Sequence, residues 1–125
     1  MVNYFFDSYA LIEIITGNEN YKGYTKSKVI ITKINLIECY NSWISEMGEE
    51  KADYYFSFFK PCCIEILDKD IKDGVKFRIH LKSKNKKINP SYIDCIGYVI
   101  SLRLNIKFLT GDNAFKDLPN VEFVK

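Results

Sequence analysis

Short, continuous apolar runs alternate with longer stretches of helical periodicity along this chain, and this alternation is the strongest constraint on its fold. The runs expected as strands are 2–6, 29–32, 62–67, 106–109 and 121–124. Strands with one face in water alternate apolar and polar residues, whereas continuous apolar runs indicate strands buried on both faces. We therefore expect an α/β fold, a three-layer α/β/α sandwich with a mainly parallel central sheet.

The segments between these runs carry helical patterns with defined ends. The helices expected are 9–15, 33–47, 49–60, 68–81 and 91–104, with a helical turn at 114–118. Gly17 and Asn105 follow two of them and suit the left-handed conformation that ends many helices. In the helix 68–81, the residues expected to face the core are Ile71, Val75 and Ile79. The lysine-rich segment 82–87 is predicted to be a linker, and Pro90 suits the start of the last long helix.

The size and composition of the chain fit one globular domain that spans residues 1–125. Apolar residues make up 47% of the 125 residues, enough for a proper core. The formal net charge is only +2, so nucleic-acid binding would have to come from a local basic patch. No apolar run reaches the roughly 18 residues of a membrane span, and no secretory signal is recognisable. A cytoplasmic protein without a membrane anchor is expected.

The cysteines and the single histidine do not indicate a zinc site or a nucleophilic triad. The four cysteines form no C-x-x-C pair, and without a secretory signal they are expected to be reduced thiols. His80 has no Cys or Ser partner nearby in sequence and is interpreted as an ordinary helix residue.

Acidic residues, in contrast, stand where an α/β protein places its functional groups. Ligands of open α/β sheets bind beyond the carboxyl ends of the strands. Asp7 and Asp112 each follow an expected strand, Asp94 lies in the first turn of an apolar helix, and Glu38 lies on the helix after the second strand.

Each of these acids also has an ordinary structural explanation. Asp7 could cap the following helix, Asp94 could complete a capping box with Ser91, and Asp112 could be a turn residue. Glu38 could lie on a solvated helix face. Taken together, they form the oxygen-rich inventory that hard divalent cations require, and such cations can promote hydrolysis of a phosphodiester. Spacing alone leaves both interpretations open.

Two stretches of the sequence resemble the PIN-domain family. The opening Tyr4-Phe5-Phe6-Asp7-Ser8 is similar to the family's first strand, its acid and the small hydroxyl residue after it. The segment from Asp94 to Phe115 is similar to the C-terminal signature, which ends in T-x-D-x-x-F, here 110–115. Glu38 resembles the family's second acid, and the order of elements matches along the whole chain.

The resemblance implies an Mg²⁺- or Mn²⁺-dependent ribonuclease of the VapC toxin type, with RNA as substrate, a homodimeric state and a cognate antitoxin as partner. It implies that Asp7, Asp94 and Asp112 hold the metal and that Glu38 supports the metal or the attacking water. Ser8 and Thr110 are expected to donate hydrogen bonds to the aspartates, and Asn113 to contact substrate or to support the turn.

The chain departs from the family at Ala114, where members often carry another Asp, and the nearest substitute is Asp117. This departure leaves the number of bound metal ions open. The lysines that offer RNA contacts, with a solvated linker as the alternative, are Lys82, Lys84, Lys86 and Lys87.

Two other functions remain to be distinguished from that of a ribonuclease. A PIN fold could serve RNA processing as a non-catalytic binding module, which metal-dependent cleavage would distinguish. A flavodoxin-like receiver would need paired acids at its first strand, and Asp7 has no acidic neighbour.

The aromatic segment 54–59 exceeds what one small helix buries within a monomer, which favours a dimer interface.

Overall fold

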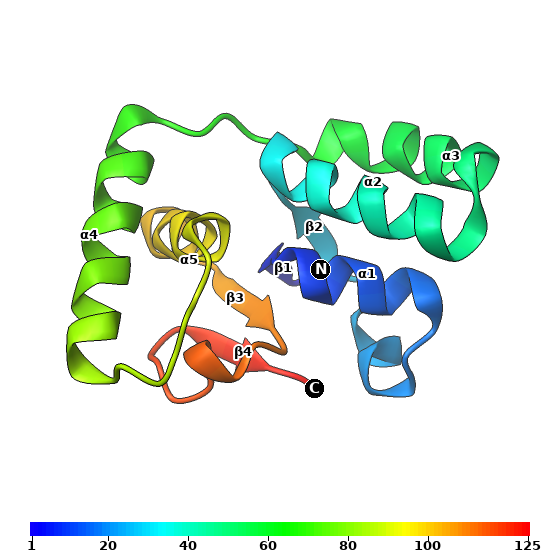
Figure 1. Cartoon of the computed structure of the whole chain (residues 1–125). Coiled ribbons are helices and arrows are strands. Elements are labelled where there is room, and N and C mark those ends of the chain that lie inside the picture. Colours follow the sequence, from blue (N-terminus) through cyan, green and yellow to red (C-terminus); the bar gives the residue numbers. More distant parts are fainter.

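The computed structural model describes residues 1–125 and consists of a small sheet between two groups of helices (Figure 1). The strands are β1 (Asn3–Phe6), β2 (Lys28–Ile30), β3 (Lys107–Thr110) and β4 (Val121–Phe123). The α-helices are α1 (Ser8–Thr16), α2 (Lys33–Met47), α3 (Glu49–Phe59), α4 (Asp68–Lys84) and α5 (Tyr92–Leu104). Three short 3₁₀ segments are η1 (Glu19–Tyr24), η2 (Lys60–Cys62) and η3 (Asn113–Phe115).

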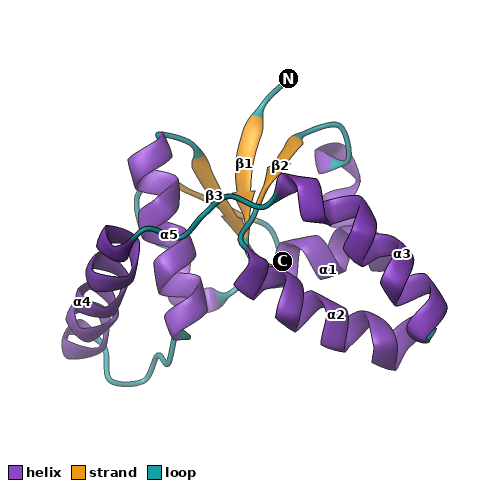
Figure 2. Ribbon diagram, turned by 90° about the horizontal axis from the view of Figure 1, so that it is seen from above, coloured by secondary structure: helices purple, strands orange, loops and turns teal.

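The four strands form one entirely parallel sheet in the order β2-β1-β3-β4. Helices α1, α2 and α3 lie on one side of the sheet, and α4 and α5 lie on the other (Figure 2). The predicted three-layer α/β/α sandwich is therefore confirmed. Because all strands run the same way, their carboxyl ends meet at one edge of the sheet. No helix of the structure is both long and apolar enough to cross a bilayer.

Successive residues of the strands supply two separate cores. Phe6 and Leu109 belong to a cluster with the helices α1 to α3 that includes the fully buried Trp43. Phe5 and Phe108 face the other way and stack at 5.9 Å within the cluster beneath α5. Side chains one residue apart point to opposite faces of a sheet, so a continuous apolar run can bury both faces of a strand.

Two sequence-based expectations about helix ends are confirmed, and one cap was not predicted. Gly17 ends α1 with φ of 86°, and Asn105 ends α5 with φ of 55°, both in the left-handed region. Thr32 caps α2 and forms a reciprocal capping box with Asn35. All four cysteines are free thiols, and His80 is an exposed residue of α4.

The expected strand over residues 62–67 is wrong. Only Cys63 forms a bridge, to Ile31 beside β2. Ile31 donates to the carbonyl of Cys62 and accepts from the amide of Ile64, and the chain then leaves the sheet edge. Pro61, which has no amide hydrogen, lies in the 3₁₀ turn η2 just before this contact. The apolar residues of this run pack instead, since Ile64 and Ile66 contact the core beneath α5.

Two expectations about α4 also need correction. The helix continues to Lys84, so Lys82 and Lys84 are helical rather than part of a linker. Ile71 and Ile79 are 46% and 63% exposed and do not face the core. The buried face of α4 instead carries Gly74 and Leu81, together with Asp70, whose carboxylate forms two hydrogen bonds of 2.8 and 2.9 Å with Arg103 of α5. A buried charge paired across two helices is invisible to a purely hydrophobic pattern.

Gly74 allows α4 to pack closely on α5, and Gly74→Ala should lower stability. A Cβ there would lie 2.7 Å from Ile96 Cγ1 and 2.9 Å from Ile96 Cα, so the two helices would have to separate. Overpacking of this kind costs about 1–3 kcal/mol, which exceeds the gain of about 1 kcal/mol in helix propensity. Thermal melts should place Gly74→Ala below the parent. Gly23→Ala, where nothing lies within 4 Å of the new Cβ, serves as the control and should melt at or slightly above the parent, because Ala restricts the unfolded chain without a clash.

Candidate functional site

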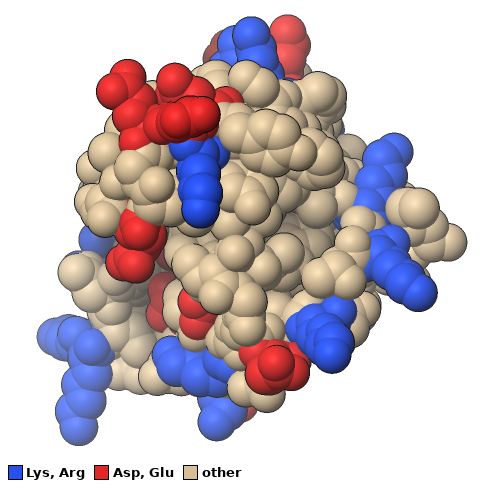
Figure 3. Space-filling model, turned by 90° about the vertical axis from the view of Figure 1, so that its right-hand side faces the viewer, with Lys and Arg blue, Asp and Glu red and all other residues tan.

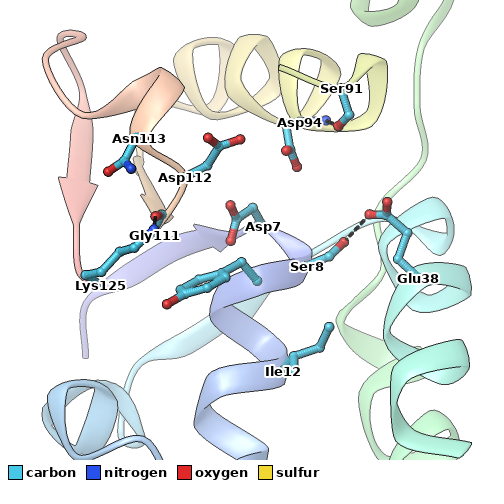
Figure 4. A pocket seen from close by; sticks show the side chains of 11 residues that line it. Asp7, Ser8, Ile12, Glu38, Ser91, Asp94, Gly111, Asp112, Asn113 and Lys125 are labelled. Atoms are coloured by element: carbon cyan, nitrogen blue, oxygen red, sulfur yellow. Dashed lines mark hydrogen bonds between the residues drawn. The ribbon is translucent and has the colours of Figure 1, made fainter. Parts of the chain in front are cut away.

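A polar pocket of about 560 Å³ opens at the carboxyl ends of the strands (Figure 4). Its lining residues are Asp7, Ser8, Tyr9, Ile12, Glu38, Ser91, Asp94, Gly111, Asp112, Asn113 and Lys125. The four acids predicted from the sequence therefore line one pocket although they come from four separate parts of the chain. Asp7, Asp94 and Asp112 point toward one another in the close-up view.

Asp7 occupies the centre of the pocket and is 1% exposed. Its Oδ1 accepts from the amide of Ala10 at 2.8 Å, which caps α1, and its Oδ2 accepts from the hydroxyl of Thr110. Asp7 therefore does cap α1, as considered from the sequence. The cap leaves its carboxylate facing the other acids. Burial holds the pKa of Asp7 well above its usual range, and the nearby charge of Asp94 adds to this shift.

Asp94 lies in the first turn of α5 but does not complete a capping box. Ser91 caps the helix by accepting from the amide of Asp94 at 3.0 Å, and the reciprocal bond from the Asp94 side chain is absent. The carboxylate faces the pocket instead. Burial, followed by the charges of Asp112 and Glu38, raises the pKa of Asp94 to about 7. Near neutral pH this group therefore carries a proton for a substantial part of the time.

Asp112 is held by the turn after β3. Its Oδ1 accepts from the amide of Ala114 at 2.9 Å, and its own amide donates to the Thr110 hydroxyl at 3.0 Å. Thr110 is fully buried and uses one hydroxyl for both acids: it donates to Asp7 and accepts from Asp112. The expectation that Thr110 donates to an aspartate therefore agrees with the structure, and this hydroxyl links the Asp7 carboxylate to the backbone of Asp112.

Glu38 approaches from α2, on the side of the pocket opposite Lys125 (Figure 4). Its Oε1 accepts from the Ser8 hydroxyl at 2.5 Å, and Ser8 in turn accepts from Asn35 Nδ2 at 3.2 Å. Ser8 therefore donates to Glu38 and not to an aspartate as expected. Asn35 was not predicted because its role depends on a contact between α2 and the start of α1, which are separate in sequence.

The chemistry of the pocket fits a hard divalent cation. Its acidic donors are all carboxylate oxygens, no histidine or cysteine lines it, and two of the acids have raised pKa values that a cation would lower. No group of three acidic, histidine or cysteine side chains is arranged so that it could hold a metal ion as it stands. A fit through bridging water molecules or small side-chain rotations is compatible with Mg²⁺, which usually keeps several waters.

Some predicted residues lie away from the pocket, and some lining residues were not predicted. Asp117 is exposed after η3 and does not line the pocket. Lys82, Lys84, Lys86 and Lys87 do not line it either; they lie at the end of α4 and in the loop before α5. Asn113 does line it. The lining residues missed from sequence are Tyr9, Ile12, Ser91, Gly111 and Lys125. Their side-chain types are too common to stand out without the tertiary arrangement.

Comparison with solved structures confirms the PIN-like fold. A structure of Mycobacterium tuberculosis VapC20, described as a sarcin-ricin loop cleaving toxin, aligns with TM-score 0.75 and 13% identity over 98% of this chain and 99% of that one. VapBC2 from Rickettsia felis bound to a promoter DNA fragment gives TM-score 0.71 and 16% identity over 99% and 100%. A toxin–antitoxin complex from Klebsiella pneumoniae gives 0.68 and 19% over 95% of each chain. No protein-family model and no curated protein sequence matches the chain. The chain therefore has the α/β/α fold of the VapC structures along its whole length.

Proposed function

We propose that this protein is a metal-dependent endoribonuclease that hydrolyses RNA phosphodiesters, and that it is the toxin of a VapBC-type toxin–antitoxin pair. The observation that carries the proposal is the convergence of Asp7, Asp94 and Asp112, with Glu38 opposite, in one pocket at the carboxyl edge of a parallel sheet. Burial, followed by the charges of neighbouring carboxylates, raises the pKa values of Asp7 and Asp94, and such an arrangement is unfavourable on its own and typical of a cation site.

In this proposal Asp7, Asp94 and Asp112 hold Mg²⁺ or Mn²⁺, directly or through water. When bound, the ion supplies charge neutralisation at the phosphodiester and lowers the pKa of a water molecule. Thr110 orients the Asp7 carboxylate and joins it to the backbone of Asp112 through its single hydroxyl. Asp94 would hold the ion only in its ionised form, because a ligand carboxyl must be deprotonated, so metal binding would be coupled to loss of a proton.

Glu38 orients the attacking water or accepts its proton. The hydrogen bond from Ser8 occupies Oε1 and leaves Oε2 free of hydrogen bonds from the protein. A carboxylate fixed at one oxygen and open at the other can accept a hydrogen bond from water in a defined direction. Asn35 supports this arrangement, since its amide group donates to Ser8 and holds the hydroxyl toward Glu38.

The toxin assignment draws on structures whose descriptions name toxin–antitoxin complexes and, for VapC20, cleavage of the sarcin-ricin loop. By analogy we propose a cognate antitoxin as partner, RNA as substrate and action in the cytoplasm. Inspection of the neighbouring reading frames provides an independent test, because a small DNA-binding protein encoded beside this chain would support the toxin assignment.

Cleavage assays test the proposed activity directly. The parent protein should cleave mixed single-stranded RNAs when Mg²⁺ or Mn²⁺ is present and should be inactive in EDTA. If no RNA is cleaved and neither ion changes the melting temperature, the alternative holds: a PIN fold that binds RNA without cleaving it.

We also propose a homodimer that involves the aromatic segment of α3. Tyr54 and Phe58 are 63% and 60% exposed, and they line an apolar groove with residues of α1. The face that carries α3 shows a broad area free of charged side chains (Figure 3). Exposed apolar patches of this kind often mark interfaces.

The dimer prediction is checked by light scattering at high micromolar concentration. The parent should have the mass of a dimer, and Tyr54→Ser combined with Phe58→Ser should shift the mass toward that of a monomer. Ile79→Ser serves as the matched control, because Ile79 is 63% exposed on α4, on the other side of the sheet, and should leave the dimer intact. A parent of monomeric mass would contradict this prediction.

A further inference from the structure

Lys125 is the only lysine or arginine among the residues that line the carboxylate pocket. We propose that its ammonium group binds a phosphate of the RNA strand next to the phosphodiester that is cleaved. This inference rests on the proposed ribonuclease function and adds a substrate-positioning residue to it. The lysine lies across the pocket from Glu38 (Figure 4), so it would fix the direction in which the strand crosses the aspartates.

The backbone that carries Lys125 is fixed on both sides. Beyond β4, the amide of Val124 donates to the carbonyl of Thr110 at 2.9 Å, and the carbonyl of Val124 accepts from the Tyr21 hydroxyl. The carbonyl of Lys125 itself accepts from Asn20 Nδ2 at 3.0 Å. Residues of β3 and η1 therefore hold this segment beside the pocket. The backbone of Lys125 is fixed although its side chain is exposed.

Gly111 makes this close approach possible. A Cβ at Gly111 would lie 2.7 Å from the carbonyl oxygen of Val124 and 2.2 Å from Cε1 of Tyr9. Only a residue without a side chain lets the end of β4 and the Tyr9 ring both contact the turn after β3. Through this turn Lys125 is tied to the same segment that positions Asp112.

The ammonium group of Lys125 is oriented by its contacts but is not paired with a carboxylate. Lys125 Nζ donates to the carbonyl of Gly111 at 2.9 Å and lies 5.6 Å from the centre of the Tyr9 ring. It forms no ion pair with any carboxylate of the pocket, since the structure has only the pairs Lys69–Asp73 and Arg103–Asp70. Two of its three donor hydrogens therefore remain available, and an ammonium group with free donors is a common phosphate ligand.

A nucleic acid that enters a pocket of four acids needs compensating positive charge. A cation held by the aspartates would neutralise the charge of the phosphate that reacts, and Lys125 would neutralise that of a neighbouring phosphate of the same strand. If Lys125 instead only neutralised the acids, its removal would alter metal binding. If it binds RNA, its removal lowers RNA affinity and leaves metal binding as it was.

The test compares Lys125→Met with Lys116→Met. Lys116 is a matched control, because its Nζ also lies 5.6 Å from an aromatic ring, that of Phe123, yet it is exposed and outside the pocket. Binding of a short fluorescent single-stranded RNA is measured by anisotropy with Mn²⁺ over a range of salt concentrations, and every protein in this assay, the parent included, carries Glu38→Gln so that cleavage is slow. Metal binding is followed separately, as the Mn²⁺-dependent shift in melting temperature.

Lys125→Met should weaken RNA binding about fivefold to tenfold at low salt and reduce the slope of log Kd against log salt by about 0.7, the value for one phosphate contact on a single strand. Lys125→Arg should retain most of the affinity, and Lys116→Met should behave as the parent. In cleavage assays with Mn²⁺, Lys125→Met should raise KM and change kcat less than about threefold.

Equal RNA affinity and salt slope for Lys125→Met and the parent would overturn the inference, as would an altered Mn²⁺ shift with unaltered RNA affinity, or a parent that does not bind RNA. A parent that binds RNA through Lys125 without cleaving it would leave this inference standing and remove the proposed ribonuclease activity. The two failures are thereby distinguishable.

Discussion

Asp7→Asn should reduce metal-dependent RNA cleavage by more than about 100-fold while the fold remains intact. Loss of an outer partner of a metal ligand already costs about 10–100-fold, and loss of a ligand carboxylate should cost more. Asn retains the oxygen that caps α1 by accepting from Ala10, and it caps a helix about as well as Asp. The substitution therefore keeps the cap and removes the charge, while the amide Nδ2 that replaces Oδ2 can donate to the Thr110 hydroxyl oxygen in place of the bond that Oδ2 accepted.

The same substitution should leave the metal-free protein at least as stable as the parent. The pKa of Asp7 is raised by burial and by Asp94, so the ionised form is disfavoured in the folded state and a neutral amide removes this cost. Asp117→Asn is the control, because it also removes one negative charge near the site but lies exposed and outside the pocket. It should cleave like the parent. Cleavage by Asp7→Asn at the parental rate would rule out the assigned role.

The layers of this fold follow from features that are local in sequence. The run Phe5-Phe6 and the run Phe108-Leu109 each supply one side chain to each face of the sheet, which is why continuous apolar runs predict a sheet covered on both sides. The ends of α1 and α5 were predictable because Gly17 and Asn105 suit a conformation that most residues avoid.

The errors lie where tertiary contacts override local pattern. Residues 62–67 have the composition of a strand, but only Ile31 offers them a partner, so they bridge once and leave the sheet. In α4 two of the three buried positions are Asp70 and Gly74, which a hydrophobic pattern ignores. Asp70 pairs with Arg103, and Gly74 permits close contact with Ile96.

The candidate site divides in the same way. Asp7 and Asp112 follow strands of one parallel sheet, so their proximity could be predicted from topology alone. Lys125 reaches the pocket only because Gly111 lacks a side chain and Tyr21 holds Val124, contacts that join residues far apart in sequence. No spacing rule connects those positions. The sequence therefore predicted the acids of the pocket but not Lys125.

The second large effect expected is a pH-dependent stabilisation by Mn²⁺ or Mg²⁺. In EDTA the melting temperature should fall as pH rises from about 4 to about 7. Within this window the folded protein holds more protons than the unfolded chain, because the pKa of Asp94 is about 7 when folded and near 4 when unfolded. Ionisation of Asp94 therefore lowers the stability of the folded state as pH rises. The raised pKa of Asp7 has the same effect.

With the cation present the trend should reverse, since metal binding requires ionised carboxylates and strengthens as they lose their protons. At a hundredfold excess over the dissociation constant, binding contributes about 2.7 kcal/mol, a rise of roughly 10 °C for a domain of this size. The difference between melts in Mn²⁺ and in EDTA should thus be small near pH 5 and largest above pH 7. Asp94→Asn should flatten the decline in EDTA and lose most of the Mn²⁺ effect, whereas Asp117→Asn should keep both. Parallel pH profiles with and without Mn²⁺ would mean that these carboxylates do not bind the ion, and the raised pKa of Asp94 would then reflect burial and crowding alone.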